Sequence, residues 1–370
     1  MSETVITQVS PWFDEREKAL ISECLDAAWI TEGPKSAEFQ SRLNELIGTP
    51  YGVFAPNGTL ALVLGLLALG IGPGDEVLVP DTTFIGSANA VIMTGATPIF
   101  VEVTAGNFQI DLTGADALVS ERTKAIMPVH MFGMCGDMDA VRAFAARHGL
   151  KIIEDAAQAI GVRYDGIHAG AMGDVGCFSF FADKTITTGE GGYVVCRDEA
   201  VYDRLRLLRN QGRFDRGAYV HPAIGYNFRI TDLQAAIGLA QLEKMPEILA
   251  KKASHLARYT QNLAGLDEVY LLTPQPKSDY VPFRLFLFSP AGQALLDHVN
   301  AHGVQSRPFF YPLHRQPCFE CLTETQALDD ARFPNAIRAY EHGQCLPIHP
   351  ALTDSQIDRV CEIVRGFFGK

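Results

Sequence analysis

The sequence predicts an α/β protein: a mainly parallel central sheet with helices on both faces, followed by a smaller C-terminal α/β domain. Three observations lead to this prediction. Short apolar, β-branched runs alternate with helical stretches through the first part of the chain. The texture changes after Arg229, where longer helical stretches begin. Finally, 47% of the 370 residues are hydrophobic, which is enough for a large core.

Six strands are expected in the first part, at residues 76–80, 98–103, 125–130, 151–154, 176–181 and 192–196. Helices are expected before, between and after them, at residues 59–69, 87–93, 137–147 and 200–209. This alternation is typical of a parallel sheet covered by helices. Ligands on such sheets bind beyond the carboxyl ends of the strands. Residues that end or follow a strand are therefore the first candidates for a functional site.

The remainder of the chain predicts one more helix at residues 231–242 and then a second unit. The helices expected next lie at residues 245–264, 291–301 and 353–368. A proline-punctuated stretch at 272–282 precedes an expected strand at 283–288, and a loop is expected at 306–317. We therefore expect a large domain at residues 1–245 and a small C-terminal domain at residues 246–370.

Composition and cysteine usage exclude several classes of protein. The net charge of −12 and the pI near 5.3 argue against a nucleic-acid binder. The eight scattered cysteines indicate reduced thiols, and the pair Cys318 and Cys321 stands without the further ligands that zinc needs, so no metal is expected. The beginning of the chain does not resemble a signal peptide, and the apolar run at 60–71 is too short for a membrane span. We expect a cytoplasmic protein.

Lys184 and Asp155 together suggest a pyridoxal phosphate site. Lys184 follows Ser179, near a strand end, by five residues and precedes a glycine-rich stretch, whereas Asp155 directly follows another strand. This cofactor needs an amine, a carboxylate for its pyridine nitrogen and donors for its phosphate. A buried acid also needs a partner. Taken singly, Lys184 could be a solvated loop lysine, and Asp155 could cap a helix with Gln158 on the surface.

Other residues could complete such a site. Asn57, Gly58 and Thr59 precede an apolar helix, whose free amides favour an anion, although Asn57 could be a plain cap. The Ser179 hydroxyl could add a donor. The Phe84 ring could stack on the pyridine or belong to the core. Further candidates are Asn227, a phosphate donor or a turn residue, and His314 and His349, which could line a pocket or be structural.

These motifs occur in an order that resembles the DegT-type nucleotide-sugar aminotransferases, which have the fold type I architecture. The resemblance spans residues 29–31, 57–59, 72–80, 127–130, 154–158, 184–192 and 225–242. It implies pyridoxal 5'-phosphate as cofactor, a homodimer with shared active sites, and L-glutamate as amino donor. It also implies roles for individual residues: Lys184 as Schiff-base lysine, Asp155 at the pyridine nitrogen, Gln158 at the ring hydroxyl, Phe84 as stacking ring, Gly58, Thr59 and Ser179 at the phosphate, and Asn227 at the phosphate of the other subunit.

Within the family, residues 127–130, 133–138 and 225–242 look closest to the perosamine synthases. These enzymes aminate C4 of GDP-4-keto-6-deoxymannose for O-antigen of lipopolysaccharide. An aminotransferase acting on C3 or C4 of a dTDP- or UDP-linked keto sugar is an alternative. So is a non-catalytic regulator that binds the cofactor. Dehydratase relatives carry histidine in place of Lys184, which argues against that activity. Arg229, Arg307, His314 and the loop 309–312 are candidates for the substrate.

Two features depart from the family pattern. Asp183 stands directly before the lysine, where we expect asparagine or a small residue. A carboxylate there favours a charged lysine. The stretch 272–288 is short, and relatives carry a longer, aromatic-rich strand region near the expected nucleotide site.

Overall fold

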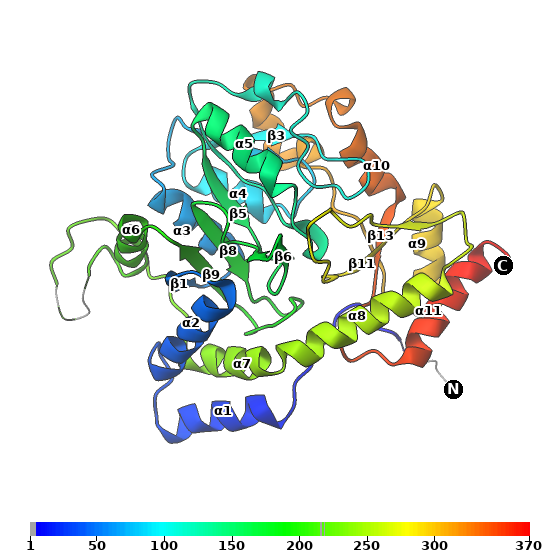
Figure 1. Ribbon diagram of the computed structural model, residues 1–370, viewed down its shortest axis with the longest axis horizontal. Coiled ribbons are helices and arrows are strands. Elements are labelled where there is room, and N and C mark those ends of the chain that lie inside the picture. The colour runs from blue at the N-terminus through cyan, green and yellow to red at the C-terminus, as the bar shows by residue number, and fades with distance from the viewer. Residues whose placement is uncertain (1–4, 215–216, 218) are drawn as a thin grey trace.

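The computed structural model describes residues 5–214, 217 and 219–370 (Figure 1). Its centre is a seven-stranded sheet in the order β1-β9-β8-β5-β4-β2-β3. The pairs from β8 to β3 are parallel, whereas β9 runs antiparallel to both β8 and β1. The strands are β1 (Tyr51–Ala55), β2 (Glu76–Pro80), β3 (Thr97–Val101), β4 (Thr123–Ile126), β5 (Lys151–Asp155), β8 (Val175–Ser179) and β9 (Gly192–Cys196).

All six expected strands are present in the central sheet, but the sequence reading missed its remaining strand, β1, and the separate pair β6 (Arg163–Tyr164) and β7 (Ile167–His168). The helices at Glu15–Asp26 and Pro34–Ile47 were not expected either. The strand expected at 125–130 ends earlier, because Pro128 has no N–H to donate to a neighbouring strand. Beyond it, only an isolated bridge between Val129 and Asp155 continues the pairing. The sheet therefore stops near the point where Asp155 ends β5.

Helices cover both faces of the sheet, as predicted. On one face, α3 (Gly58–Ala68), α4 (Gly86–Met93) and α6 (Glu199–Arg209) contribute to a core cluster shared with Val79 and Ile153. On the other face, α2 (Pro34–Ile47), α5 (Met138–His148) and α7 (Asp232–Glu243) pack around Leu78 and Ile152. Adjacent residues of one strand, such as Leu78 and Val79, thus pack into the cores on opposite faces of the sheet, because side chains alternate along a strand.

A second, antiparallel sheet lies in the C-terminal part, in the order β10-β11-β13-β12. Its strands are β10 (Tyr270–Leu271), β11 (Leu285–Phe288), β12 (Arg307–Pro308) and β13 (Gly343–Leu346), and its helices are α8 (Met245–Asn262), α9 (Gly292–Ala301), α10 (Pro334–His342) and α11 (Asp354–Phe367). The expected loop at 306–317 contains β12 and a short 3-10 helix, Leu313–Arg315. None of the helices that the structure describes is both long and apolar enough to cross a membrane.

The two parts of the chain are in contact through shared apolar residues. Phe286 and Phe309 of the C-terminal part belong to the same cluster as α3, and Ile6 packs into the C-terminal cluster. Figure 1 shows α7 and α8 following one another from the large sheet toward α11. The domain boundary at residue 245 stays a proposal.

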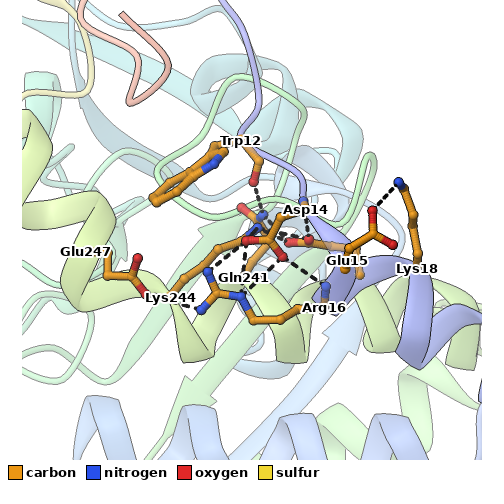
Figure 2. Close-up of polar contacts among 9 residues, drawn as sticks. Trp12, Asp14, Glu15, Arg16, Lys18, Gln241, Lys244 and Glu247 are labelled. Carbon is orange, nitrogen blue, oxygen red and sulfur yellow. Dashed lines mark hydrogen bonds and ion pairs between the residues drawn. The ribbon is translucent and has the colours of Figure 1, made fainter. Parts of the chain in front are cut away.

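A buried ion cluster fixes the N-terminal segment to the junction of α7 and α8 (Figure 2). The fully buried Lys244 ammonium lies 2.7 Å from Glu17 of α1 (Glu15–Asp26) and 3.3 Å from Asp14, which caps that helix. Gln241 donates to both Glu17 and the Trp12 carbonyl oxygen. At the other end of the segment, Gln8 donates to the Cys345 carbonyl oxygen. Residues 8–12 are therefore held across both parts of the molecule.

Candidate active site

Asp155 and Ser179 end the adjacent parallel strands β5 and β8, so both lie at the carboxyl edge of the sheet, as predicted. The Asp155 side chain is almost completely buried. One carboxylate oxygen accepts a 2.6 Å hydrogen bond from the Ser87 hydroxyl, and the other accepts from the Ala157 amide at 3.1 Å. Ser87 is in turn 3.0 Å from the Thr83 hydroxyl. These bonds orient the carboxylate and offset part of the cost of burying it.

An anion cradle lies beside this carboxylate. Asn57 caps α3 by accepting a hydrogen bond from the Leu60 amide, and the amides of Gly58 and Thr59 in the first turn have no acceptor within the helix. A Cβ atom at position 58 would lie 2.8 Å from the Ser179 Cβ. Glycine is therefore required there, and the close approach places the Ser179 hydroxyl at the helix N-terminus. Free amides, a hydroxyl and the helix dipole suit a phosphate.

Phe84 is beside the cradle and is 60% exposed, which excludes the alternative that it is a core residue. A Cβ atom at Gly86 would lie 2.8 Å from the Thr59 hydroxyl and 3.1 Å from the Phe84 ring. The small Gly86 thus separates the ring from the first turn of α3. An exposed ring in this position can cover a flat ligand.

Gln158 is buried, so the alternative that it is a surface residue is also excluded. Its carbonyl oxygen accepts from the Phe132 amide at 2.8 Å, and its amino group is 3.7 Å from the Met131 sulfur. Phe132 has a positive φ of 66°. The contact of Gln158 with a cofactor hydroxyl stays a prediction.

Lys184 lies in the turn that follows β8. Its amide donates to the Phe181 carbonyl oxygen at 3.0 Å, and Gly189 returns the chain toward β9 with a φ of +81°. The side chain is only 14% exposed, and Nζ lies 4.3 Å from the Phe283 ring centroid. Burial lowers the pKa of the Lys184 amine, and the charges of Asp183 and Asp155 oppose this shift. A lysine in such surroundings has more of the uncharged, nucleophilic form.

Asp183, the unexpected residue, forms an ion pair with Arg284. Its other carboxylate oxygen lies 3.8 Å from the Lys184 ammonium, beyond hydrogen-bonding distance. Sequence reasoning missed Arg284, although a buried carboxylate beside a lysine could have prompted a search for a further cation. Arg284 lies in the stretch 272–288 that departs from the family pattern.

The structure does not bring every candidate residue to this group. Asn227 is exposed and accepts a 2.7 Å hydrogen bond from Arg229, and Arg307 is exposed on β12. The His314 side chain is fully buried, with its two ring nitrogens 2.7 Å from Asp81 and 3.2 Å from Asp330. These contacts favour a structural role for His314. His349, in contrast, lines a small cavity next to Lys184.

A buried amine, a buried carboxylate and an anion cradle at the carboxyl edge of a parallel sheet define an α/β enzyme of the class that uses a flat, phosphorylated cofactor. Comparison with known proteins narrows this class. Residues 11–365 match the DegT/DnrJ/EryC1/StrS aminotransferase family, and the chain belongs to that family.

Two relatives and one solved structure illustrate the similarity. The GDP-perosamine synthase of Caulobacter vibrioides is 40% identical over 362 residues, which cover 96% of each chain. The UDP-N-acetyl-3-dehydro-alpha-D-glucosamine 3-aminotransferase of Acidithiobacillus ferrooxidans is 37% identical, with 93% of this chain and 92% of that one covered. The PLP form of Spr1654, a sugar aminotransferase from Streptococcus pneumoniae, superimposes with a TM-score of 0.91 at 27% identity and covers 98% of each chain.

Proposed function

We propose that this aminotransferase uses pyridoxal phosphate to transfer the amino group of L-glutamate to C4 of GDP-4-keto-6-deoxymannose in the cytoplasm. The observation that carries the proposal is the arrangement of Lys184, Asp155 and the Gly58–Ser179 contact at one sheet edge. The residues fit the cofactor, since the missing Cβ of Gly58 leaves the Gly58 and Thr59 amides next to the Ser179 hydroxyl. When bound, the cofactor supplies a ring that withdraws electrons from the carbon of an attached amino group.

The residues of this chain then have separate tasks. The Lys184 amine holds the cofactor and moves the proton at the amino-bearing carbon. Asp155 holds the proton of the ring nitrogen, with its carboxylate fixed by Ser87. Gly58, Thr59 and Ser179 would bind the phosphate, Phe84 would cover the ring face, and Gln158 would contact the ring hydroxyl. Burial lowers the pKa of the Lys184 amine and thereby increases its uncharged fraction relative to an exposed lysine.

The choice of sugar rests on the relatives. The Caulobacter relative, which is named for GDP-perosamine, has 40% identity to this chain and supports the GDP-linked 4-keto sugar. The Acidithiobacillus relative, which is named for a UDP-linked 3-keto sugar, has 37% identity and supports C3 amination as a second candidate. The half-buried Arg229 and the exposed Arg307 are cations for the nucleotide, whereas the buried ion pairs of His314 leave it a weaker candidate.

The proposal includes a homodimer in which Asn227 reaches the phosphate of the partner subunit. Asn227 is exposed and lies outside the group around Lys184 in its own chain. Its backbone forms an antiparallel bridge with Asn210, directly after α6, so the backbone at Asn227 is tied to the end of that helix.

The test combines attachment of the cofactor with turnover. Borohydride treatment of the protein incubated with pyridoxal phosphate should add the cofactor's mass to the peptide that contains Lys184, and a Lys184→Ala variant should lack this label. Turnover should then be measured with glutamate and a panel of GDP-, dTDP- and UDP-linked 3-keto and 4-keto sugars. The GDP-linked 4-keto sugar should give the highest kcat/KM. Labelling of Lys184 together with inertness toward the entire panel would instead favour a regulator that binds the cofactor.

A further inference from the structure

The charged groups around the Lys184 amine come from four parts of the chain. Asp183 precedes it, and Asp155 ends β5. Arg284, which directly precedes β11, pairs with Asp183. Lys252 of α8 and His349 line the same small cavity as Lys184. Since the amine has no hydrogen-bond partner among the described residues, its charge state depends on the balance of these neighbours.

Arg284 takes one side of the Asp183 carboxylate. Its Nη2 donates to Oδ2, whereas Oδ1, which faces Lys184, accepts no hydrogen bond from the described residues. Both side chains are largely buried. A buried carboxylate paired on one side only still attracts a nearby ammonium, and the guanidinium reduces that attraction.

The position of Arg284 is fixed on several sides. Its Nη1 lies 3.3 Å from the side-chain oxygen of Gln8, which is in the anchored N-terminal segment. The preceding backbone is held by Lys252, whose buried ammonium donates to the Pro282 carbonyl oxygen at 2.9 Å. Phe283 lies between Pro282 and Arg284 in the sequence, and its ring faces the Lys184 ammonium. These contacts hold the Arg284 guanidinium and the backbone that precedes it next to Asp183 and Lys184.

We propose that Arg284 is a positioning residue, which holds Asp183 away from Lys184 and so keeps the lysine amine uncharged and available as a nucleophile. The identity of the group that Lys184 attacks rests on the function proposed above, but the charge balance does not. The two unusual features of the sequence, Asp183 and the divergent stretch 272–288, are then connected, because the stretch supplies Arg284 as the cation that pairs with Asp183.

A double-mutant cycle tests the inference. The full-length protein, freed of cofactor, is treated with trace acetic anhydride from pH 6 to 10, and labelling of Lys184 is quantified by mass spectrometry relative to the exposed Lys18. At pH 7.5, Arg284→Gln should label at Lys184 about tenfold more slowly than the wild type, because an unpaired Asp183 favours the ammonium. Asp183→Asn should label several-fold faster, and the double variant should return close to the wild-type rate.

The proposal would be overturned if Arg284→Gln had the wild-type dependence of Lys184 labelling on pH. It would also be overturned if the double variant labelled Lys184 as slowly as Arg284→Gln does. If Arg284→Gln does not fold, the isosteric Asp183→Asn decides alone: a profile equal to the wild type overturns the proposal, and faster labelling supports it. Failure of the proposed function looks different, because the cofactor would then fail to attach to Lys184 although the labelling rates still differ among the variants.

Discussion

The Ser87 hydroxyl donates a 2.6 Å hydrogen bond to the Asp155 carboxylate and thereby joins the first turn of α4 to the end of β5. Ser87 lies three residues beyond Phe84, so one short segment carries both the exposed ring and the partner of the buried acid. The hydrogen bond couples the position of the ring to that of the carboxylate.

Ser87→Ala should therefore weaken both stability and cofactor binding. Removing the hydroxyl leaves one oxygen of a buried carboxylate without its donor, which costs about 1–3 kcal/mol of unfolding free energy. Urea denaturation and a titration with pyridoxal phosphate measure the two effects. Ser22→Ala is a matched control, since the Ser22 hydroxyl bonds only to a carbonyl oxygen of its own exposed helix. Equal behaviour of the two variants would contradict the role of Ser87.

Gly58→Ala should lower the affinity for the cofactor by tenfold or more, on the order of 1.4 kcal/mol. The added Cβ would meet the Ser179 Cβ at 2.8 Å and force apart the helix start and the strand end. Equilibrium dialysis with pyridoxal phosphate measures the change. Gly366→Ala in α11 has open space around its Cβ and should bind the cofactor like the wild type. A Gly58→Ala variant with unchanged affinity would remove the cradle from the proposed site.

Lys244→Ala should be among the most destabilising single changes, at about 3–5 kcal/mol, because it leaves Glu17 buried without its cation. The double variant Glu17→Gln/Lys244→Met should recover much of this loss, since no charge then stays buried. The exposed Lys18, shown in Figure 2 beside Glu15, provides the control, and Lys18→Ala should leave the unfolding free energy unchanged. If the double variant did not recover unfolding free energy, the loss in Lys244→Ala would come from packing and not from the unpaired charge of Glu17.

His314 should make stability depend on pH. Burial alone would lower the pKa of His314, but the Asp81 and Asp330 carboxylates raise it above its ordinary value. A raised folded-state pKa stabilises the protein fully below the ordinary value near 6.5, and this stabilisation is lost as the pH rises through the folded-state value. The difference in unfolding free energy between the wild type and His314→Gln should therefore be largest at acidic pH and decline above about pH 6.5. Urea denaturation across this pH range measures the difference, and His221→Gln is the control at an exposed histidine. If the difference for His314→Gln did not depend on pH, the raised pKa of His314 would be contradicted.

Mixed dimers should reveal shared active sites. Lys184→Ala and Asn227→Ala should each be nearly inactive alone, because in the proposed homodimer both sites of either variant would be incomplete. Coexpression of the two chains with different tags, followed by isolation of the mixed dimer, should restore part of the wild-type activity, since one site then has both residues intact. An inactive mixed dimer of normal size would place Asn227 outside the partner's site.

Sequence reasoning recovered the residues whose signal is local. Asp155 and Ser179 end strands, Asn57 starts a helix, and Lys184 precedes a glycine-rich turn. Such features follow from propensity and turn chemistry along a few neighbouring positions. The same reasoning placed α3, α4, α5, α6 and α7, but it missed α1, α2 and β1. The five residues of β1 carry little pattern of their own.

The contacts that it missed join residues far apart in the chain. Arg284 reaches Asp183 across 101 positions, and Ser87 reaches Asp155 across 68. Neither an arginine in a proline-rich stretch nor a serine in a short helix has a distinctive neighbourhood in the sequence. Only the topology of the sheet and the path of the C-terminal part bring these side chains to their partners.

The anchoring of residues 8–12 also constrains how the site is assembled during synthesis. Residues 8–12 line the small cavity next to Lys184, and they are translated well before Gln241 and Cys345, to which they bond. Until Cys345 has been translated, this side of the Lys184 cavity lacks part of its support. A nascent chain can thus form the cradle of α3 early, but it completes the surroundings of Lys184 only after residues 8–12 meet these later partners.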